Sequence, residues 1–409
     1  MKNETKKGIL IIVENLPVPF DTRVWQEATT LVANGYDVSV ICPTGKGATS
    51  YREELEGVHI YRHDLPEADG VAGYAKEYLG ALRAQRNLAE VVWKERGFDV
   101  IHGCNPPDDI YMVAKKFRKR GVDYVFDHHD ICPELFDAKF GDHKNLGLIK
   151  RLLYKTQTYL ERKTYENAAF AFVTNESYRK IAIERGGMDS DKVIVLRSGP
   201  KLERMRIQPG DDTIKRGKPY MVGYLGVIGE QEGIEYLLEA AKILKESRGD
   251  VFWGIVGGGP HLGVLRNMAH EMDLDDCVEF TGRVSDEELL RYLNTADVCV
   301  NSDEYNPMND KSTMNKILEY MALGKPIVQF DLTEGRYSAQ DASLYAERNN
   351  AKSMADKISS LLDNPEQCRA MGEYGRSRVI NELSWEHTSE ALLDGYTRYF
   401  AGEFNNDAS

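Results

Sequence analysis

Short apolar runs, many of them rich in β-branched residues, alternate along the chain with longer stretches that repeat apolar positions at helical spacing. Strands that are apolar throughout are typical of parallel sheets with both faces covered, and helices make the crossovers. In the first half the predicted strands are 8–14, 37–43, 58–62, 99–103, 123–127, 170–174 and 193–197, with helices at 22–34, 74–96 and 146–167 among others. This pattern predicts a doubly wound α/β sheet.

A polar segment interrupts the alternation. Residues 198–219 contain three prolines and three glycines and have no strong period, which is typical of a linker. The alternation then resumes with strands at 220–225, 251–256, 277–281, 297–301 and 326–330, helices at 233–247, 260–272, 285–294 and 313–323, and more helices beyond 350. We expect two α/β domains, 1–200 and 220–383, joined by 201–219, with a C-terminal helix at about 384–409 that returns to the first domain.

Composition and charge exclude several classes of protein. The net charge of −13 argues against non-specific binding of nucleic acid, which requires clustered positive charge. The six cysteines are scattered, with no CxxC pair and no His/Cys spacing typical of zinc, so we expect a reducing compartment and no structural zinc. The apolar run near the N-terminus is too short for a signal peptide, and no stretch approaches the roughly 18–20 apolar residues of a membrane span. We therefore expect a cytoplasmic protein.

Two glycine-rich turns follow predicted strands of the second half. Their glycines are Gly223, Gly226, Gly229 and Gly233 in the first turn and Gly257, Gly258 and Gly259 in the second. Glycine lets a backbone approach a phosphate closely, and the next helix N-terminus favours an anion. Position 262 is leucine, so the GxGxxG fingerprint fails and an NAD-dependent oxidoreductase is disfavoured. Tight turns that bind nothing would also explain these glycines.

The ordered set of motifs resembles glycosyltransferase family 4. The second half has VGYLG (222–226), GIEYLLEAA (233–241), FWGIVGGGP (252–260), VEFTGR (278–283) and KILEYMALGKPIV (316–328). The first half has FDTRVWQE (20–27), DVIHGCNPPD (99–108), DHHDICPE (127–134) and FVTNESYRK (172–180). The resemblance implies the GT-B architecture, in which two Rossmann-like domains face a cleft. It also implies a nucleotide-sugar donor on the C-terminal domain and an acceptor on the N-terminal domain.

The resemblance implies donor-binding roles around residues 311–319. The second acid of the family's Glu-x7-Glu motif is carried over as Glu319, which would accept hydrogen bonds from the ribose hydroxyls, as suits a carboxylate. Backbone amides at a helix N-terminus would face the diphosphate, namely those of Ser312, Thr313, Met314 and Asn315. The same site would include Gly226, Gly257, Gly258 and Arg283. A buried salt bridge is the alternative role for Glu319, and a surface position is the alternative for Arg283.

Three positions depart from the family pattern. Lys311 stands where the first Glu is expected, Val227 replaces an Arg, and Glu232 replaces a Lys. In the family that Arg and Lys clamp the donor phosphates, and the first Glu contacts the donor sugar. We hypothesise that Lys316, with Lys311, supplies the missing positive charge and that Lys316 stabilises the leaving phosphate. Asp310 is a candidate substitute for the missing acid.

Side chains that follow strands of the first half are expected near the acceptor. By resemblance, His129 and Asp130 lie near the reacting sugar, although one histidine of the pair 128–129 would alternatively be packed. Arg23 would contact phosphate, with capping of the helix by Asp21 or Thr22 as the alternative. Asn105 would line the acceptor side.

The family resemblance implies a retaining glycosyltransferase that needs no obligatory metal. It would move a sugar from a nucleotide-diphosphate donor, with a UDP-sugar favoured, to a saccharide or lipid-linked acceptor in surface polysaccharide biosynthesis. A sugar-nucleotide epimerase of the same fold and a non-catalytic nucleotide-sugar-binding partner are the alternatives, which product analysis and nucleotide binding would distinguish.

One predicted helix is basic although the protein as a whole is acidic. Its cationic residues are Lys150, Arg151, Lys155, Arg162 and Lys163. These residues form either a solvated helix face or a peripheral contact with anionic lipid at the inner face of the membrane.

Overall fold

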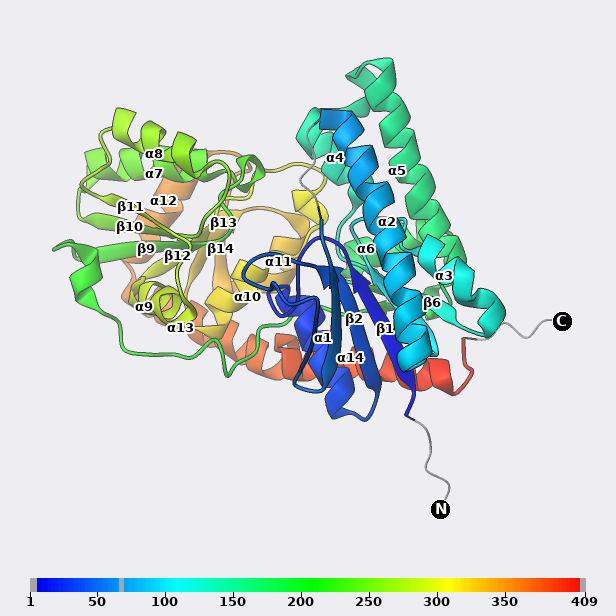
Figure 1. The fold of residues 1–409 in the computed structure, drawn as a ribbon. Helices are drawn as coiled ribbons and strands as arrows, with labels where there is room; N and C mark the ends of the chain where they lie inside the picture. Colours follow the sequence, from blue (N-terminus) through cyan, green and yellow to red (C-terminus); the bar gives the residue numbers. More distant parts are fainter. Residues whose placement is uncertain (1–5, 66–69, 405–409) are drawn as a thin grey trace. The chain divides into compact units, whose positions relative to one another are not determined.

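The protein is described by a computed structural model in which residues 6–65 and 70–404 are placed, with the side chains of 70–77 left out (Figure 1). The chain divides into two compact units. Unit 1 holds the chain up to Arg197 together with the residues from Ser389 onward, and unit 2 is Ser198–Thr388. Each unit contains one β-sheet.

The sheet of unit 1 has eight strands in the order β3-β4-β2-β1-β5-β6-β7-β8. Their bounds are β1 Gly8–Val13, β2 Asp37–Pro43, β3 Arg52–Leu55, β4 Val58–His63, β5 Val100–Cys104, β6 Asp123–His128, β7 Phe170–Val173 and β8 Val193–Val195. The pairs are parallel except for β3 with β4. This confirms the predicted parallel sheet. Strand β3 was not predicted because its residues, REEL, are all exposed and carry no apolar run.

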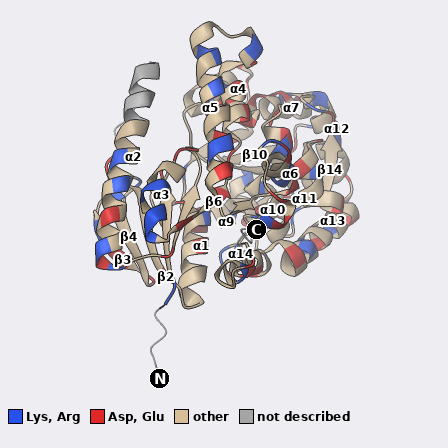
Figure 2. Cartoon of the chain, turned by 90° about the vertical axis from the view of Figure 1, so that its right-hand side faces the viewer, with Lys and Arg blue, Asp and Glu red and all other residues tan. Residues whose placement is uncertain are grey.

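Helices cover the sheet of unit 1. They are α1 Thr22–Ala33, α2 Gly70–Glu95, α3 Tyr111–Phe117, α4 Cys132–Phe140, α5 Leu148–Asn167 and α6 Glu176–Glu184. Asp21 caps α1, because its Oδ1 accepts a hydrogen bond from the Val24 amide at 3.1 Å. Helices α4 and α5 form a hairpin, and Lys and Arg residues are present at its connecting end (blue in Figure 2).

The C-terminal helix α14 (Trp385–Phe400) packs on unit 1, as the sequence predicts for a helix that returns to the first domain. The Tyr396 hydroxyl lies 2.6 Å from Nδ1 of the buried His102. The Tyr396 ring also packs edge-on against Phe170, with ring centroids 5.8 Å apart.

The sheet of unit 2 has six parallel strands in the order β11-β10-β9-β12-β13-β14. Their bounds are β9 Tyr220–Leu225, β10 Val251–Val256, β11 Val278–Gly282, β12 Val298–Asn301, β13 Ile327–Phe330 and β14 Ser343–Ala346. The strand order reverses between β9 and β12. In open α/β sheets the carboxyl ends of strands at such a reversal form the usual ligand crevice.

Helices cover both faces of this second sheet. They are α7 Ile234–Ser247, α8 Leu262–Glu271, α9 Asp286–Thr295, α10 Asn315–Ala322, α11 Thr333–Ala339, α12 Ala351–Leu362 and α13 Pro365–Arg378. Alternate residues of β10 enter two separate cores, Trp253 on one face and Phe252 on the other. Burial on both faces explains why the strands are apolar throughout. Within the described ranges no helix is long and apolar enough to cross a bilayer.

Candidate functional site

The residues predicted for function fall into two groups, one at the carboxyl ends of the strands in each unit. In unit 2, Gly226 directly follows β9, Gly257 follows β10 and Arg283 follows β11. The segment 311–319 comes after β12 and leads into α10. All of these positions follow the carboxyl ends of strands, where open α/β sheets bind their ligands.

The two glycine turns of unit 2 are in direct backbone contact. The Gly226 amide donates to the carbonyl of Val256 at 3.1 Å, and the Gly257 amide donates to the carbonyl of Gly282 at 3.1 Å. Gly257 has φ of +145°, and a Cβ atom there would lie 1.8 Å from the Gly226 oxygen. Glycine at 257 is therefore required by the contact between the turns themselves, as the tight-turn alternative proposed. A Cβ at Gly258 would meet only ordinary contacts, with Arg283.

Lys316 is buried in a cluster of acidic and hydroxyl groups. Its Nζ lies 2.9 Å from Asp303 Oδ1, 3.1 Å from Glu232 Oε2 and 3.3 Å from the Tyr224 hydroxyl. Burial opposes its charge, but these neighbours raise the pKa of Lys316 well above its usual value. Burial also raises the pKa of Asp303 to about 7, although Lys316 opposes that rise.

These contacts account for one of the departures from the family pattern. Glu232, which stands where the family has a Lys, is the ion-pair partner of Lys316. The ammonium of Lys316 is thus charged, but its charge is offset by Glu232. A diphosphate that binds Lys316 must compete with this carboxylate.

Glu319 forms the salt bridge that was considered as its alternative role. Its Oε1 accepts a hydrogen bond from Arg204 Nη1 at 2.8 Å, and the same guanidinium holds both oxygens of Asp286 at 2.8 and 2.9 Å. Burial raises the pKa of Glu319, and Arg204 opposes that rise. Within the described parts of the chain no donor reaches Oε2 of Glu319, whose side chain is 19% exposed. One oxygen of the carboxylate is therefore fixed and the other is open to a ligand.

The polar residues before α10 are placed as follows. Met314 is the N-cap of α10 and makes no side-chain capping bond, and the amides that begin a helix have no intrahelical acceptor. Ser312 Oγ donates to the Met308 carbonyl at 2.8 Å. Thr313 and Lys311 are half-buried, Asn315 is exposed, and Arg283 is exposed beyond β11.

Asp310 is engaged elsewhere. Its Oδ1 accepts a hydrogen bond from the Thr333 amide and its Oδ2 accepts one from the Thr333 hydroxyl, each at 3.0 Å. Arg348 also lies 3.5 Å from Oδ1. These contacts disfavour Asp310 as the substitute for the missing family acid.

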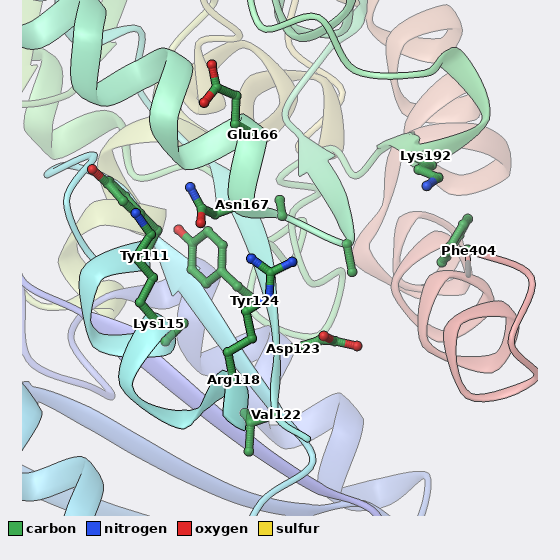
Figure 3. A pocket seen from close by; sticks show the side chains of 13 residues that line it. Tyr111, Lys115, Arg118, Val122, Asp123, Tyr124, Glu166, Asn167, Lys192 and Phe404 are labelled. Carbon is green, nitrogen blue, oxygen red and sulfur yellow. The ribbon is translucent and has the colours of Figure 1, made fainter. Parts of the chain in front are cut away.

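Unit 1 contains a pocket of about 260 Å³ that contains none of the predicted site residues (Figure 3). Its lining includes Val122 and Asp123 at the start of β6, Ala169 before β7 and Lys192 before β8. It therefore lies at the amino ends of these strands, whereas His129 and Asp130 follow the carboxyl end of β6.

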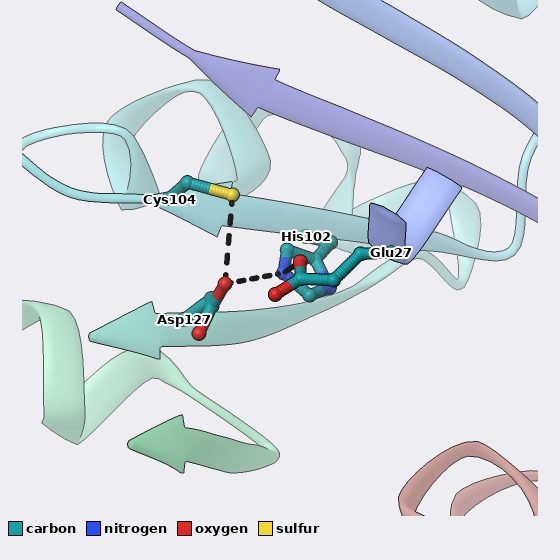
Figure 4. A group of neighbouring side chains, drawn as sticks. All are labelled: Glu27, His102, Cys104 and Asp127. Carbon is teal, nitrogen blue, oxygen red and sulfur yellow. Dashed lines mark hydrogen bonds and ion pairs between the residues drawn. The ribbon is translucent and has the colours of Figure 1, made fainter. Parts of the chain in front are cut away.

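The second group is built on a buried ion cluster, of which Figure 4 draws Glu27, His102, Cys104 and Asp127. Arg23 Nη2 lies 2.8 Å from Asp127 Oδ1, and its Nε lies 3.0 Å from Glu27 Oε1. Arg23 Nη1 donates to the Leu196 carbonyl at 2.9 Å. Each guanidinium nitrogen thus has a partner inside unit 1, which disfavours the expected contact of Arg23 with phosphate.

The charges in this cluster are unequal. Burial opposes ionisation of Asp127, but Arg23 and His129 hold its pKa well below the usual range. Burial and the neighbouring Asp127 raise the pKa of Glu27 well above the usual range. Burial lowers the pKa of His102, so that this histidine is neutral at pH 7.

Four side chains of the cluster have the chemistry of metal ligands. The donor atoms of Glu27, His102, Cys104 and Asp127 lie within 4.8 Å of one another, and all four residues are buried. Arg23 already supplies a positive charge to both carboxylates.

His129 and Asp130 are placed by Asn105. The Asn105 Oδ1 accepts hydrogen bonds from the amides of His129 at 2.7 Å and Asp130 at 3.1 Å, and its Nδ2 donates to the Asp130 carbonyl at 2.6 Å. Asn105 is buried and its side chain holds this loop, which disfavours the expected place of Asn105 at the acceptor side. The Nε2 of His129 bonds Asp127, while among the described residues no donor reaches the half-buried carboxylate of Asp130, whose pKa burial raises.

His128 is the packed member of the histidine pair, as the alternative for this pair anticipated. Its Nδ1 lies 2.6 Å from the Tyr165 hydroxyl, and burial lowers its pKa to about 3. Since the unfolded chain has a His pKa of about 6.5, it binds a proton that the folded chain does not between pH 6.5 and 3. His128 therefore contributes a loss of stability as the pH falls through this range.

We expect His128→Phe to remove this pH dependence. The free energy of unfolding of the wild type should fall by about 2 kcal/mol more than that of the variant between pH 7 and 5. Chemical denaturation followed at a series of pH values measures the difference. If the free energy of unfolding depends on pH equally in the two proteins, His128 binds its proton in the folded chain as it does in the unfolded chain.

Several residues that form these groups were not predicted. Arg204 lies in the polar linker, where no sequence pattern distinguishes it. Asp303 could have been found, because it follows a predicted strand at its carboxyl end. Glu27 also gave a signal, because it lies four residues after Arg23 in a predicted amphipathic helix.

Two family models match the chain. The model of the group 1 glycosyl transferases matches residues 211–378, and that of a glycosyl transferase 4-like domain matches residues 21–199. Between them they cover most of both units.

Curated relatives are distant. A Mycobacterium tuberculosis glycogen synthase is 22% identical over 92% of this chain and 90% of its own length. An uncharacterised glycosyltransferase of Haemophilus influenzae is 28% identical over 39% of this chain, and the match spans 46% of that protein.

Solved structures share the fold. A sucrose-phosphate synthase from Thermosynechococcus elongatus has a TM-score of 0.76 and 18% identity over 97% of this chain and 100% of its own. A structure of Anabaena HepE in complex with UDP and glucose has a TM-score of 0.69 and 13% identity over 95% of this chain and 99% of its own.

Proposed function

Because the chain belongs to the family 4 type of GT-B glycosyltransferases, we propose that it transfers a sugar from a UDP-sugar to a saccharide or lipid-linked acceptor, with retention, in surface polysaccharide biosynthesis. The observation that carries the proposal is the half-open carboxylate of Glu319, next to the start of α10 and to a charged Lys316. The UDP complex of Anabaena HepE, which shares the fold, supports uridine as the base.

The unit 2 residues have separate tasks in donor binding. The open Oε2 of Glu319 accepts hydrogen bonds from the ribose hydroxyls, while Arg204 keeps Oε1 in place. The amides at the start of α10, around Met314 and Asn315, face the diphosphate. Lys316 transfers part of its interaction from Glu232 to the phosphate as negative charge develops on the leaving group.

The chemical step requires no protein nucleophile. The acceptor hydroxyl oxygen forms a bond to the anomeric carbon on the face from which the nucleotide leaves, and the bond from that carbon to the phosphate oxygen breaks. The bonding electrons go to the diphosphate, which takes the proton of the acceptor hydroxyl. His129 and Asp130 contact the acceptor and the reacting sugar, and they are held for this by Asp127 and Asn105. In this scheme the amides and Lys316 stabilise the phosphate charge, and no step uses a metal ion.

The test is thermal unfolding in the presence of UDP, GDP, ADP, dTDP and CMP. UDP at about 100 times its dissociation constant should add about 2.7 kcal/mol and raise the melting temperature by about 5–10 °C. A larger shift with another nucleotide would overturn the choice of uridine. Lys316→Met should lose affinity for UDP but keep that for uridine, and an unchanged UDP affinity would remove Lys316 from the phosphate site.

Product analysis then separates the activities. Incubation with a UDP-sugar and a saccharide acceptor should give a glycoside whose anomeric configuration matches that of the donor. An epimerised nucleotide sugar without a glycoside would indicate the epimerase instead. Failure of every nucleotide to shift the melting temperature would favour a non-catalytic protein.

A further inference from the structure

Three large aliphatic side chains are exposed side by side at the start of α5. Leu148 is 83% exposed, Ile149 is 71% exposed and Leu152 is 66% exposed. Single exposed apolar residues are common on soluble proteins, but neighbouring ones mark sites of interaction. Leu148 and Leu152 are four residues apart and so lie on one face of the helix.

The same end of the hairpin is rich in basic side chains. The basic residues are Lys144, Lys150, Arg151 and Lys155. All four are exposed, and none forms an ion pair with a residue that the structure describes. The sequence has no Asp or Glu from His143 to Leu160, although the whole chain has a net charge of −13. Figure 2 shows this basic end of the hairpin of α4 and α5.

The hairpin holds these side chains on a folded support. The rings of His143 and Tyr154 stack with centroids 3.6 Å apart, and Phe136 packs against Tyr154 at 6.0 Å. At the other end of α5, Glu161, Thr164 and Tyr165 are buried. The first turns of the helix are therefore presented in a fixed conformation, and binding through them need not order the chain.

We propose that residues 144–155, the α5 surface, bind an anionic lipid bilayer. Leu148, Ile149 and Leu152 enter the boundary between headgroups and acyl chains, and the four cations contact lipid phosphates. A second copy of the chain would present the same positive charge, which disfavours a symmetric dimer through this surface. A lipid-linked acceptor, as in the proposed function, would give this membrane binding its biological purpose. Only that purpose rests on the proposed function, and the binding itself does not.

Vesicle flotation with the full-length protein tests the α5 surface. We expect binding to vesicles of phosphatidylcholine with phosphatidylglycerol and none to phosphatidylcholine alone. Replacing all four basic residues by glutamine should lower the partition coefficient by about a thousandfold. Salt at about 1 M should release the protein, because the Debye length falls to about 3 Å.

A second variant tests the apolar contribution. Leu148→Ser, Ile149→Ser and Leu152→Ser combined should lower the partition coefficient by at least about tenfold. The control is Val264→Ser on α8, which removes a side chain that is 55% exposed in unit 2 and should leave binding unchanged. Circular dichroism and the UDP-induced melting shift show that each variant is folded.

Three outcomes would overturn the proposal. These are failure of the wild type to bind anionic vesicles, equal binding by the triple serine variant, and an oligomer of the wild type that the triple variant loses. None of them affects the nucleotide test, so failure of the α5 surface is distinguishable from failure of the proposed function.

Discussion

Replacing Glu319 by alanine is expected to weaken binding of UDP by about 10- to 100-fold, because hydrogen bonds to a charged acceptor contribute about 1.5–3 kcal/mol. The carboxylate is held at Oε1 by Arg204 and is open at Oε2. If Oε2 receives the ribose hydroxyls, the wild type should also bind 2′,3′-dideoxy-UDP more weakly than UDP by about the same factor. The variant should bind the two nucleotides equally, and calorimetric titration measures all four affinities.

Glu287→Ala is the matched control for Glu319. Glu287 is an exposed acid on α9, and its removal changes the net charge of unit 2 by the same amount. The UDP affinity of Glu287→Ala should stay within about twofold of that of the wild type, since exposed surface charges contribute little to binding energy. If Glu319→Ala still binds UDP more tightly than the dideoxy nucleotide, Glu319 does not bind the ribose hydroxyls. The salt bridge with Arg204 would then be its only role.

Arg23→Met is expected to destabilise unit 1 by about 3–5 kcal/mol, because removing one member of a buried ion pair leaves the other charge uncompensated. Arg23 is the cation against which both Asp127 and Glu27 are buried. Burial raises the pKa of Glu27 and thus limits its charge, so most of the loss comes from Asp127. Chemical denaturation, with amide exchange in β5 and β6 as the local probe, measures the effect.

The pH dependence of this loss has a definite sign. Arg23 helps to hold the pKa of Asp127 below its unfolded value of about 3.9, so the contribution is present above that pH and is lost as the pH falls. The wild type and Arg23→Met should therefore converge in stability below about pH 4.

An exposed ion pair provides the control for Arg23. Arg52 pairs with Glu95 at 2.9 Å, and their side chains are 57% and 41% exposed. Arg52→Met should cost no more than about 1 kcal/mol. Adding Asp127→Asn to Arg23→Met should restore part of the lost stability, because the two residues interact directly. A loss below about 1 kcal/mol for Arg23→Met would show that water reaches the cluster.

The pairings at the site change how the departures from the family pattern are understood. Glu232 is part of one ion cluster with Lys316 and Asp303. A Lys at position 232, as in the family, would place a second cation beside Lys316. Glu232 in place of the family's Lys is therefore what allows Lys316 to be the single cation of this cluster. The proposed diphosphate site keeps one ammonium group, that of Lys316.

The sequence by itself determined the two parallel sheets and where along the chain the candidate chemistry lies. Strands buried on both faces must be apolar throughout, which is a local property that a sequence window records, and β2, β9 and β10 have the predicted bounds. Strands without a long apolar run were missed, such as the exposed β3 and the four-residue β14. Glu319 was selected by its motif, and Asp130 by its position after a strand.

Only the tertiary structure decided which of these groups pair. Arg204 and Glu319 are 115 residues apart, and Arg23 and Asp127 are 104 residues apart. Sheet order brings such distant strand ends and helix ends to one edge, and no local pattern encodes this order. Whether a carboxylate is open or already bound, as in Glu319 and Asp310, depends on these contacts, because a buried charge takes whichever partner the fold places beside it.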